Sequence, residues 1–334
     1  MTTPMTARDR LLGGLPLPRA GIEPTIVPPV LILIVLLVIY QIVEPGGFTA
    51  GQVGVTSMEI LPLALVSLGQ CVVVLASGID LSVGGVMSLG SALAARHFGG
   101  GPLTITAWSL VIVAIGVACG CLNGLLVCKL RLQPFLVTLA TWSILDGVAL
   151  IILPTQGQGS VSPAYGNLAF TTPGGIPFAI WVLAVVLAAW LWFRGTRAAR
   201  GIYALGSDRD NAFASGVSIT RTTILAFGIS GLGAALAALA YTVQTASGDP
   251  SAGAPFILTS VTAVVIGGTR LSGGRGGFGG TLIGAILLIL IGDVVFAVGL
   301  PTQWTQFFQG LLLVIAILAS SAGEFVAQRK AASS

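Results

Sequence analysis

Long apolar runs dominate the sequence, and only short polar segments separate them. Most of these runs approach the roughly 20 residues that an α-helix needs to cross the hydrocarbon core of a membrane. Apolar and polar residues do not alternate within the runs, so the pattern predicts helices and excludes the strands of a membrane barrel. We therefore expect an all-α protein that crosses the membrane many times.

Charge is too scarce for a water-soluble protein. The chain of 334 residues has 15 Lys and Arg, 11 Asp and Glu, and a mean hydropathy of +0.99. An ordinary soluble domain has about 25% charged residues, whereas this chain has 8%. This composition excludes a soluble protein, and the length taken up by the apolar runs leaves no room for a sizeable soluble domain.

The runs predict about ten membrane spans, with about eight or nine as the alternative. They cover residues 26–43, 59–77, 82–98, 104–128, 135–153, 178–193, 222–241, 255–268, 280–300 and 305–321. The third and eighth runs are short and rich in Gly, Ser or Thr, so both are candidates for broken or re-entrant helices. Glycines at four-residue intervals, Gly116, Gly120 and Gly124, predict close packing of the fourth run against a neighbouring helix.

Basic residues indicate the orientation, because Lys and Arg in short loops favour the cytoplasmic side. With a cytoplasmic N-terminus and about ten spans, every Lys and Arg except Arg96 falls on that side. We therefore expect cytoplasmic tails at 1–25 and 322–334, a membrane domain at 26–321, and a cytoplasmic segment at 194–221.

The sequence lacks the patterns that would predict an enzyme. Neither of its two lysines, Lys129 and Lys330, completes a P-loop, so the chain has no such motif with which to bind ATP. It has no hydrolase or metalloprotease motif, no zinc-ligand spacing and no feature typical of nucleic-acid binding. We expect no catalytic residue, no bound metal and no cofactor in this chain.

Asp80 lies at the predicted inner junction of the second and third runs. Its neighbours favour a structural role, in which Asp80 caps a helix that begins near Leu81 and Gly78, Ser82 and Gly84 form a tight turn. Direct contact with a substrate is the alternative.

Asp146 and Asp293 lie inside the fifth and ninth runs, without a comparable local explanation. Charge inside a membrane is costly, and ionisable side chains there usually face protein or water. We expect these carboxylates either to pair inside the bundle or to line a wet path.

The segment 194–221 carries five Arg and a short predicted helix between Gly206 and Gly216. Acidic residues in its first turn and a glycine after Ser215 are typical helix start and stop signals. Such a helix would lie on the membrane surface. It is either a solvated segment held to anionic lipid by Arg or a docking element for a cytoplasmic partner, with Phe213 as an apolar contact.

Several strings together resemble the ribose-type permease family. They are GIDLSVG (78–84), NGLLV (123–127) followed by PFLVTLAT (134–141), IYALGSDRDNAFASGV (202–217) and AVVIGGTRLSGGRGGFGGTLIGA (263–285). The family comprises inner-membrane subunits of bacterial, binding-protein-dependent ATP-binding-cassette importers of monosaccharides. The resemblance runs in order from about residue 26 to 321.

The resemblance implies import of a ribose-like pentose or a hexose across the bacterial inner membrane. It implies a second permease subunit, identical or different, a periplasmic binding protein that delivers the sugar, and a separate cytoplasmic ATPase that binds ATP and Mg. It also implies a lipid-embedded fold similar to the vitamin B12-importer (type II) permeases. The residues that match the family's coupling segment, which docks on the ATPase, are Asp208, Arg209, Asp210, Asn211, Ala212, Phe213, Ser215 and Gly216.

The sequence departs from the family pattern at three places. Asp146 stands where relatives usually have Arg, Ile257 and Thr259 stand where acidic residues are common, and Gly292-Asp293 replaces an Asn-rich turn. These positions leave the sugar undetermined. A permease for branched-chain amino acids or nucleosides is one alternative, and an ion-coupled secondary transporter that uses Asp146 or Asp293 is another.

Dividing the predicted spans into two equal halves suggests where the substrate path lies. Two halves of five spans would have opposite orientations, as inverted repeats do, and the two short runs would then be third in their halves. Interrupted helices at matching positions indicate a substrate site near the midplane. We therefore predict that hydroxyl groups in these runs approach the path, namely those of Ser88, Ser91, Thr259, Ser260 and Thr262.

Overall fold

The computed structural model describes residues 27–159, 161–315 and 318, and in that part of the chain all regular structure is helical. The predicted tails 1–25 and 322–334 and the end of the last run lie outside the described residues. The predicted all-α class is therefore confirmed for the part of the chain that is described.

Every predicted apolar run overlaps a helix. The helices are α2 (Val27–Val43), α3 (Ala50–Leu75), α4 (Ser82–His97), α5 (Pro102–Lys129), α6 (Pro134–Ile152), α8 (Phe178–Arg194), α11 (Ile219–Thr245), α12 (Ala254–Ile266), α13 (Phe278–Ala297) and a last helix over 303–315. Between them lie α7 (Pro163–Gly166), the 3-10 turns η2 (Asn167–Phe170) and η3 (Pro173–Gly175), α9 (Arg197–Ser207) and α10 (Arg209–Ala214).

Among the described helices, 5 are long and apolar enough to cross a membrane. The number becomes 6 if the bent pair Pro163–Gly175 and Phe178–Arg194, which turns by 81°, counts as one span. The third and eighth runs, which were predicted to be short, correspond to helices of 16 residues (α4) and 13 residues (α12). The chain is thus a multi-pass membrane protein.

Local signals set several helix starts. The hydroxyl of Thr49 caps α3 by accepting a hydrogen bond from the backbone N–H of Gln52, so this helix begins nine residues before the apolar run at residue 59. Proline opens α5 and α6, where its missing N–H leaves no hydrogen bond unmade.

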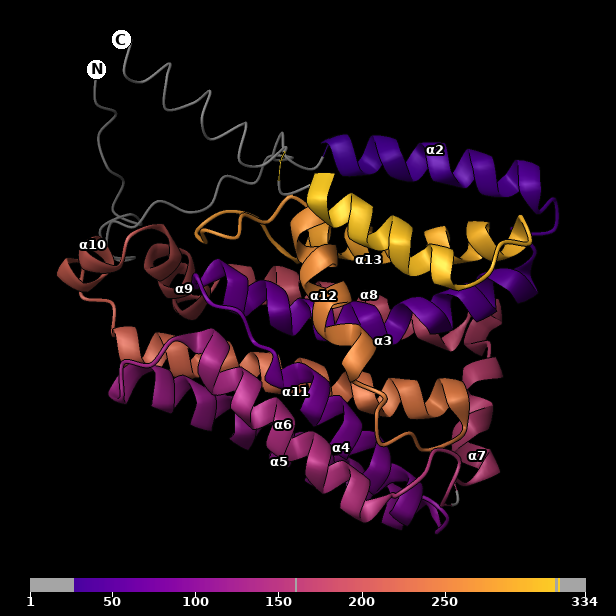
Figure 1. The fold of residues 1–334 in the computed structure, drawn as a ribbon, viewed down its shortest axis with the longest axis horizontal. Helices are drawn as coiled ribbons and strands as arrows, with labels where there is room; N and C mark the ends of the chain where they lie inside the picture. Colours follow the sequence, from indigo (N-terminus) through magenta and orange to yellow (C-terminus); the bar gives the residue numbers. More distant parts are fainter. Residues whose placement is uncertain (1–26, 160, 316–317, 319–334) are drawn as a thin grey trace.

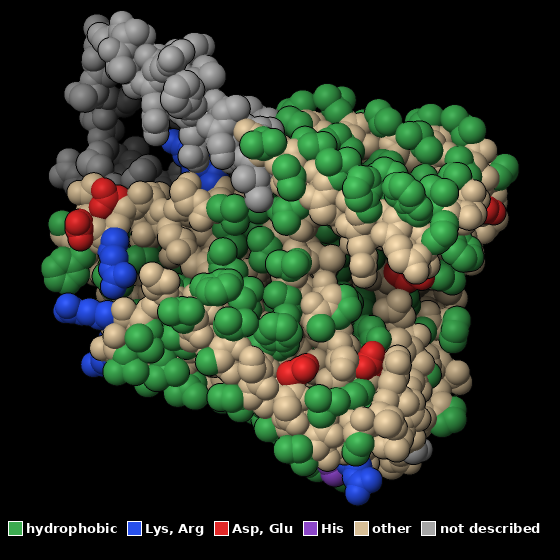
Figure 2. All heavy atoms as spheres, viewed as in Figure 1, with side chains coloured by type: hydrophobic (Ala, Val, Ile, Leu, Met, Phe, Trp, Pro, Cys, Tyr) green, Lys and Arg blue, Asp and Glu red, His purple; other side chains and the backbone are tan. Residues whose placement is uncertain are grey.

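Most helices run along the long axis of the molecule, with α9 and α10 at one end and α7 at the other (Figure 1). α3, α4 and much of α11 are buried, whereas α2, α5, α6 and α8 expose large apolar side chains. Figure 2 shows such apolar side chains over much of one face. Lipid is the solvent for this surface.

Glycines bring α5 and α11 into backbone contact. A Cβ added at Gly231 would lie 1.9 Å from the carbonyl oxygen of Gly116, and one added at Gly120 would lie 2.1 Å from that of Phe227. All three glycines of the predicted strip, Gly116, Gly120 and Gly124, are buried. The close packing predicted for the fourth run is therefore confirmed, with α11 as the partner.

Candidate functional site

Asp80 stands in the turn between α3 and α4, fully buried. Its Oδ1 accepts a hydrogen bond of 2.9 Å from the backbone N–H of Ser82, where α4 begins, and a second one from the Ser82 hydroxyl. Asp80 is thus bonded to the first residue of α4, while Leu81 occupies the N-cap position. With its amide oriented to satisfy both groups, Gln70 of α3 donates to the Asp80 carbonyl at 2.9 Å and accepts from its N–H.

A buried chain of hydrogen bonds extends from this turn into two further helices. Asn123 of α5 donates to the Ser82 hydroxyl at 2.9 Å, and Thr141 of α6 donates to Asn123 Oδ1 at 2.6 Å. Three of the strings quoted above therefore meet at one point. The network holds the start of α4 against α5 and α6, because a buried polar group left without a hydrogen-bond partner would destabilise the fold.

A glycine-rich loop over 267–277 closes the same end of the bundle. Gly274 donates its N–H to the carbonyl of Leu75 at the end of α3 (3.0 Å), and the Ser77 hydroxyl donates to the carbonyl of Ser272 (2.7 Å). Tyr203 of α9 donates to the Gly276 carbonyl at 2.8 Å. This loop, the end of α3 and α9 thus form one interlocked junction, which we call the basal junction.

Glycine is required where α9 enters the basal junction. A Cβ at Gly206 would lie 1.8 Å from the carbonyl oxygen of Leu75 and 2.7 Å from the N of Gly274. The backbone of α9 therefore rests directly on the end of α3. At this point α9 and α3 meet through backbone atoms, with no side chain between them.

The predicted surface helix is α10, and the unpredicted α9 precedes it. Asp208 caps α10 by accepting from the Asn211 N–H at 2.9 Å, and its other oxygen accepts from the Asn211 side chain. Gly216 has a left-handed backbone (φ 81°) and ends the turn, as the glycine stop predicted. Phe213 is 72% exposed, so α10 presents an apolar side chain at the end of the molecule (Figure 1).

A polar hollow of about 680 Å³ lies beneath α9 and α10. It is lined by residues that follow α3 and α5, by the end of α9, by the start of α10 and by α11, among them Ser77, Arg131, Ser207, Asp208 and Phe227.

The two short helices α4 and α12 lie side by side. A Cβ at Gly253 would lie 1.8 Å from the Gly84 carbonyl oxygen. Ser88 accepts from the Gly253 N–H at 3.2 Å, and Ser91 accepts from the Asp249 N–H at 3.0 Å. These two predicted path residues are fully buried and hold the α11–α12 loop on α4.

The predicted path hydroxyls on α12 bond to carbonyls of their own helix. Ser260 and Thr262 are buried and donate to Ile257 and Leu258. Thr259 donates to the Pro255 carbonyl at 2.7 Å and keeps part of its surface exposed. Of the five predicted path residues, Thr259 is therefore the one whose side chain is accessible from outside the fold.

The intramembrane carboxylates differ in their surroundings. Asp293 of α13 accepts from the Thr56 hydroxyl of α3 at 3.3 Å and lies within hydrogen-bonding reach of the Glu59 carboxyl. Asp146 Oδ1 has no hydrogen-bond partner in the part of the chain that is described. Asp293 therefore contributes to the contact between α13 and α3. The described contacts give Asp146 Oδ1 no comparable role.

Sequence reasoning did not single out Glu59, Asn123 or Thr141. A signal for the first two was available, because Glu59 opens an apolar run and Asn123 interrupts one. Polar residues inside spans usually face protein or water, so both positions were candidates for buried contacts.

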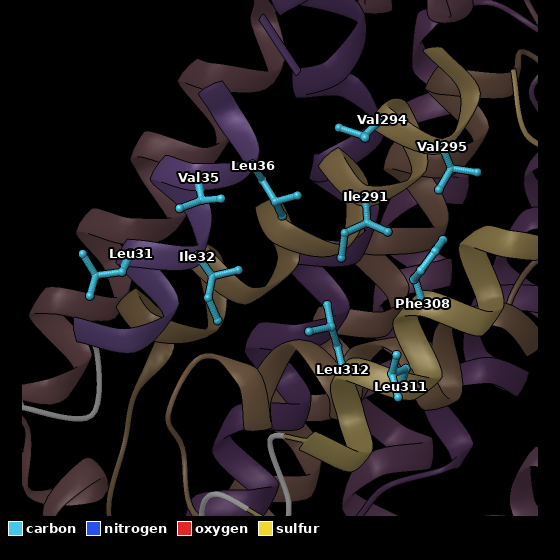
Figure 3. Close-up of a pocket in the computed structure, with 10 residues that line it drawn as sticks. All are labelled: Leu31, Ile32, Val35, Leu36, Ile291, Val294, Val295, Phe308, Leu311 and Leu312. Carbon is cyan, nitrogen blue, oxygen red and sulfur yellow. The ribbon is translucent and has the colours of Figure 1, made fainter. Parts of the chain in front are cut away.

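An apolar pocket of about 490 Å³ lies between α2, α13 and the helix over 303–315. All its labelled lining residues are apolar, among them Val35, Ile291 and Leu312 (Figure 3). The pocket offers no side-chain hydrogen bond to a polar solute, so it does not serve as the site of a sugar.

Comparison with known proteins gives the following matches. The family described as the permease component of branched-chain amino acid transport systems matches residues 55–317. The chain is 32% identical to the ribose import permease of Escherichia coli K12 over 86% of this chain and 90% of the relative. It is 32% identical to the fructose import permease of Rhizobium meliloti (86% and 83%) and to the ribose import permease of Bacillus subtilis 168 (87% and 91%). No solved structure matches it.

Proposed function

The chain belongs to the permease family of branched-chain amino acid transport systems, and from this premise we propose that its own cargo is a monosaccharide. The single observation that carries the proposal is the likeness, along nearly the whole chain, to relatives named for ribose and fructose import. As a permease component, the chain is not an enzyme. ATP is bound by a partner ATPase, and a binding protein delivers the solute.

We propose that ten helices form two inverted halves of five, with both termini in the cytoplasm and residues 26–321 as the permease domain between the tails. The pairing of two short helices, α4 and α12, supports this arrangement, because interrupted helices at matching positions of inverted repeats form midplane sites. The distribution of Lys and Arg supports the orientation.

We propose that α10 and its flanks, Asp208 to Gly216 within the segment 194–221, dock on the ATPase. Supporting observations are the exposed Phe213 at the end of the molecule and the contact of α9 with the basal junction. ATP-driven movement of the partner would displace α10 and α9, and backbone contact at Gly206 would pass this displacement to α3. Two permease subunits, identical or different, complete the path between them.

A double substitution tests whether the path runs along α12. Thr259→Val with Ser260→Ala should lower uptake at limiting substrate by about threefold to tenfold, because the contact of the accessible Thr259 hydroxyl with the solute would be lost. Thr106→Val with Ser109→Ala in α5 is the matched control, since these hydroxyls also donate to carbonyls of their own helix. Equal uptake by the two double variants would remove α12 from the path.

The choice of cargo is tested by uptake in cells that express the permease with its ATPase and binding protein. Radiolabelled ribose, fructose and leucine are offered separately. We expect accumulation of a monosaccharide and none of leucine. Accumulation of leucine alone would instead assign the chain to amino acid import.

A further inference from the structure

Two polar groups on one side of α6 have no partner. The indole Nε1 of Trp142 and Oδ1 of Asp146 are both inaccessible atoms without a hydrogen bond to any described residue. The two residues are four positions apart, so their side chains lie one above the other on the helix. A donor and an acceptor that remain unsatisfied in the same place indicate that the isolated chain lacks something that binds there.

The helical period gives the direction of this pair. Thr141 bonds Asn123 of α5, so that side of α6 faces α5. Leu145 faces α4, because a Cβ at Gly85 would lie 2.8 Å from its Cβ. The same Cβ would lie 3.1 Å from the Cα of Trp142, so Trp142 lies at the α4 contact itself. At about 100° per residue, Asp146 lies on the far side of that contact from α5 and borders the exposed face of α6.

Across α4 from this edge lies the α11–α12 loop. Asp249 in this loop is held on α4 by Ser91, accepts from the Ser251 N–H at 2.8 Å, and receives a hydrogen bond of 3.4 Å from the Tyr241 hydroxyl. Leu153, just beyond the end of α6, touches the loop, since a Cβ at Gly248 would lie 2.8 Å from its Cδ2. α6 and Asp249 thus lie against different faces of α4, α6 at Gly85 and Asp249 at Ser91.

The edge of α6 that carries Asp146 is less suited to lipid than the neighbouring face, which exposes Ile144 and Ile151. Asp146 is partly exposed, Ser143 is exposed beside it, and nothing lies within 4 Å of a Cβ at Gly147. A carboxylate that met hydrocarbon there would be costly. No Lys or Arg occurs in α6, α12 or the loop at 246–253 to neutralise it. Figure 2 shows acidic side chains near the middle of the viewed face, apart from the basic side chains at its left end and lower edge.

We propose that Trp142 and Asp146, with Asp249 beyond them, form a contact site for an uncharged polyhydroxyl solute in the path. Oδ1 of Asp146 and Nε1 of Trp142 are covered in the described fold, so the solute would reach them when α6 moves relative to its neighbours during transport. The carboxylate would then accept hydrogen bonds from solute hydroxyls, and the indole N–H would donate one to a solute oxygen. The absence of a cation from α6, α12 and the loop disfavours anionic solutes such as sugar phosphates or sugar acids. The inference rests on the proposed function and specifies the solute class.

Water access to the site can be measured without transport. Ser143→Cys, beside Asp146, should react with a charged maleimide in membranes above the background of the unsubstituted chain. Val185→Cys in α8, an apolar position that is 66% exposed, is the lipid-facing control and should not react. Equal labelling of the two variants would show that the α6 face is not wet and would overturn the site.

Recognition is tested in the complete importer with radiolabelled ribose and fructose as probes. Asp146→Asn and Trp142→Phe should each lower uptake at limiting sugar, Asp146→Asn by about tenfold or more because hydrogen bonds to charged groups are the stronger ones. Glu44→Gln, a carboxylate change at the exposed end of α2, should leave uptake unchanged. Unchanged uptake in Asp146→Asn, or equal loss in Glu44→Gln, would overturn the inference. Failure of the unsubstituted importer to take up either sugar would instead refute the proposed function, and the labelling result would stand independently.

Discussion

Replacing Phe213 with Asp is expected to abolish ATP-driven uptake while the amount of permease in the membrane stays the same. Phe213 is 72% exposed on the short helix α10, so the fold does not depend on its ring. A docked ATPase would cover the ring, and a carboxylate in its place would be buried without a partner. Aromatic residues at the centre of interfaces often contribute 2 kcal/mol or more, about a 30-fold change in affinity.

Copurification of the ATPase in mild detergent measures this directly. Phe213→Asp should lose the ATPase, and Phe213→Leu should retain most of it because an apolar contact remains. Phe170→Asp is the matched control, since Phe170 is 79% exposed in η2, away from α10. Full copurification with Phe213→Asp would mean that α10 is not the docking element.

Substitution of Gly231 by Val is expected to prevent stable folding. The carbonyl oxygen of Gly116 lies 1.9 Å from the position of a Cβ at Gly231, so α5 and α11 would have to separate. Overpacking of a well-packed core costs about 1 to 3 kcal/mol, and here the obstacle is backbone on both sides. We expect a loss at or above the top of that range, because the contact joins two of the longest helices in the described fold.

Thermal unfolding and size exclusion in detergent report this loss. Gly231→Val should give a lower melting temperature or aggregated protein. Gly310→Val is the control, because nothing lies within 4 Å of a Cβ at Gly310 and this helical glycine is exposed. If both variants had the melting temperature of the unsubstituted protein, the α5–α11 contact would not stabilise the fold.

Continuous apolarity was sufficient to find the helices that correspond to the predicted runs, because a membrane-spanning segment must satisfy its backbone within itself. The same signal misplaced the start of α3, where residues 50–58 are more polar and Thr49 supplies the cap. It also missed α9, an amphipathic helix that buries Ala199, Ile202 and Leu205. Apolarity alone does not find helices that lie on the surface.

The candidate site was only partly predictable. Asp80, Asn123 and Thr141 are far apart in sequence, and only their three-dimensional contacts reveal the buried network. The predicted path serines are buried. The sequence could not show this, because a helix that is apolar on every side has no polar face to indicate which side is accessible. Likewise, Thr56 and Asp293 are separated by 237 positions, so their contact could not be read from local pattern.

Sugar uptake by purified permease reconstituted in liposomes with its ATPase and binding protein tests the central claim most directly. The account predicts that radiolabelled ribose or fructose enters only when ATP, Mg, the ATPase and the binding protein are all present, and that permease alone with an ion gradient transports nothing. Uptake by the permease alone under a proton or sodium gradient would contradict it.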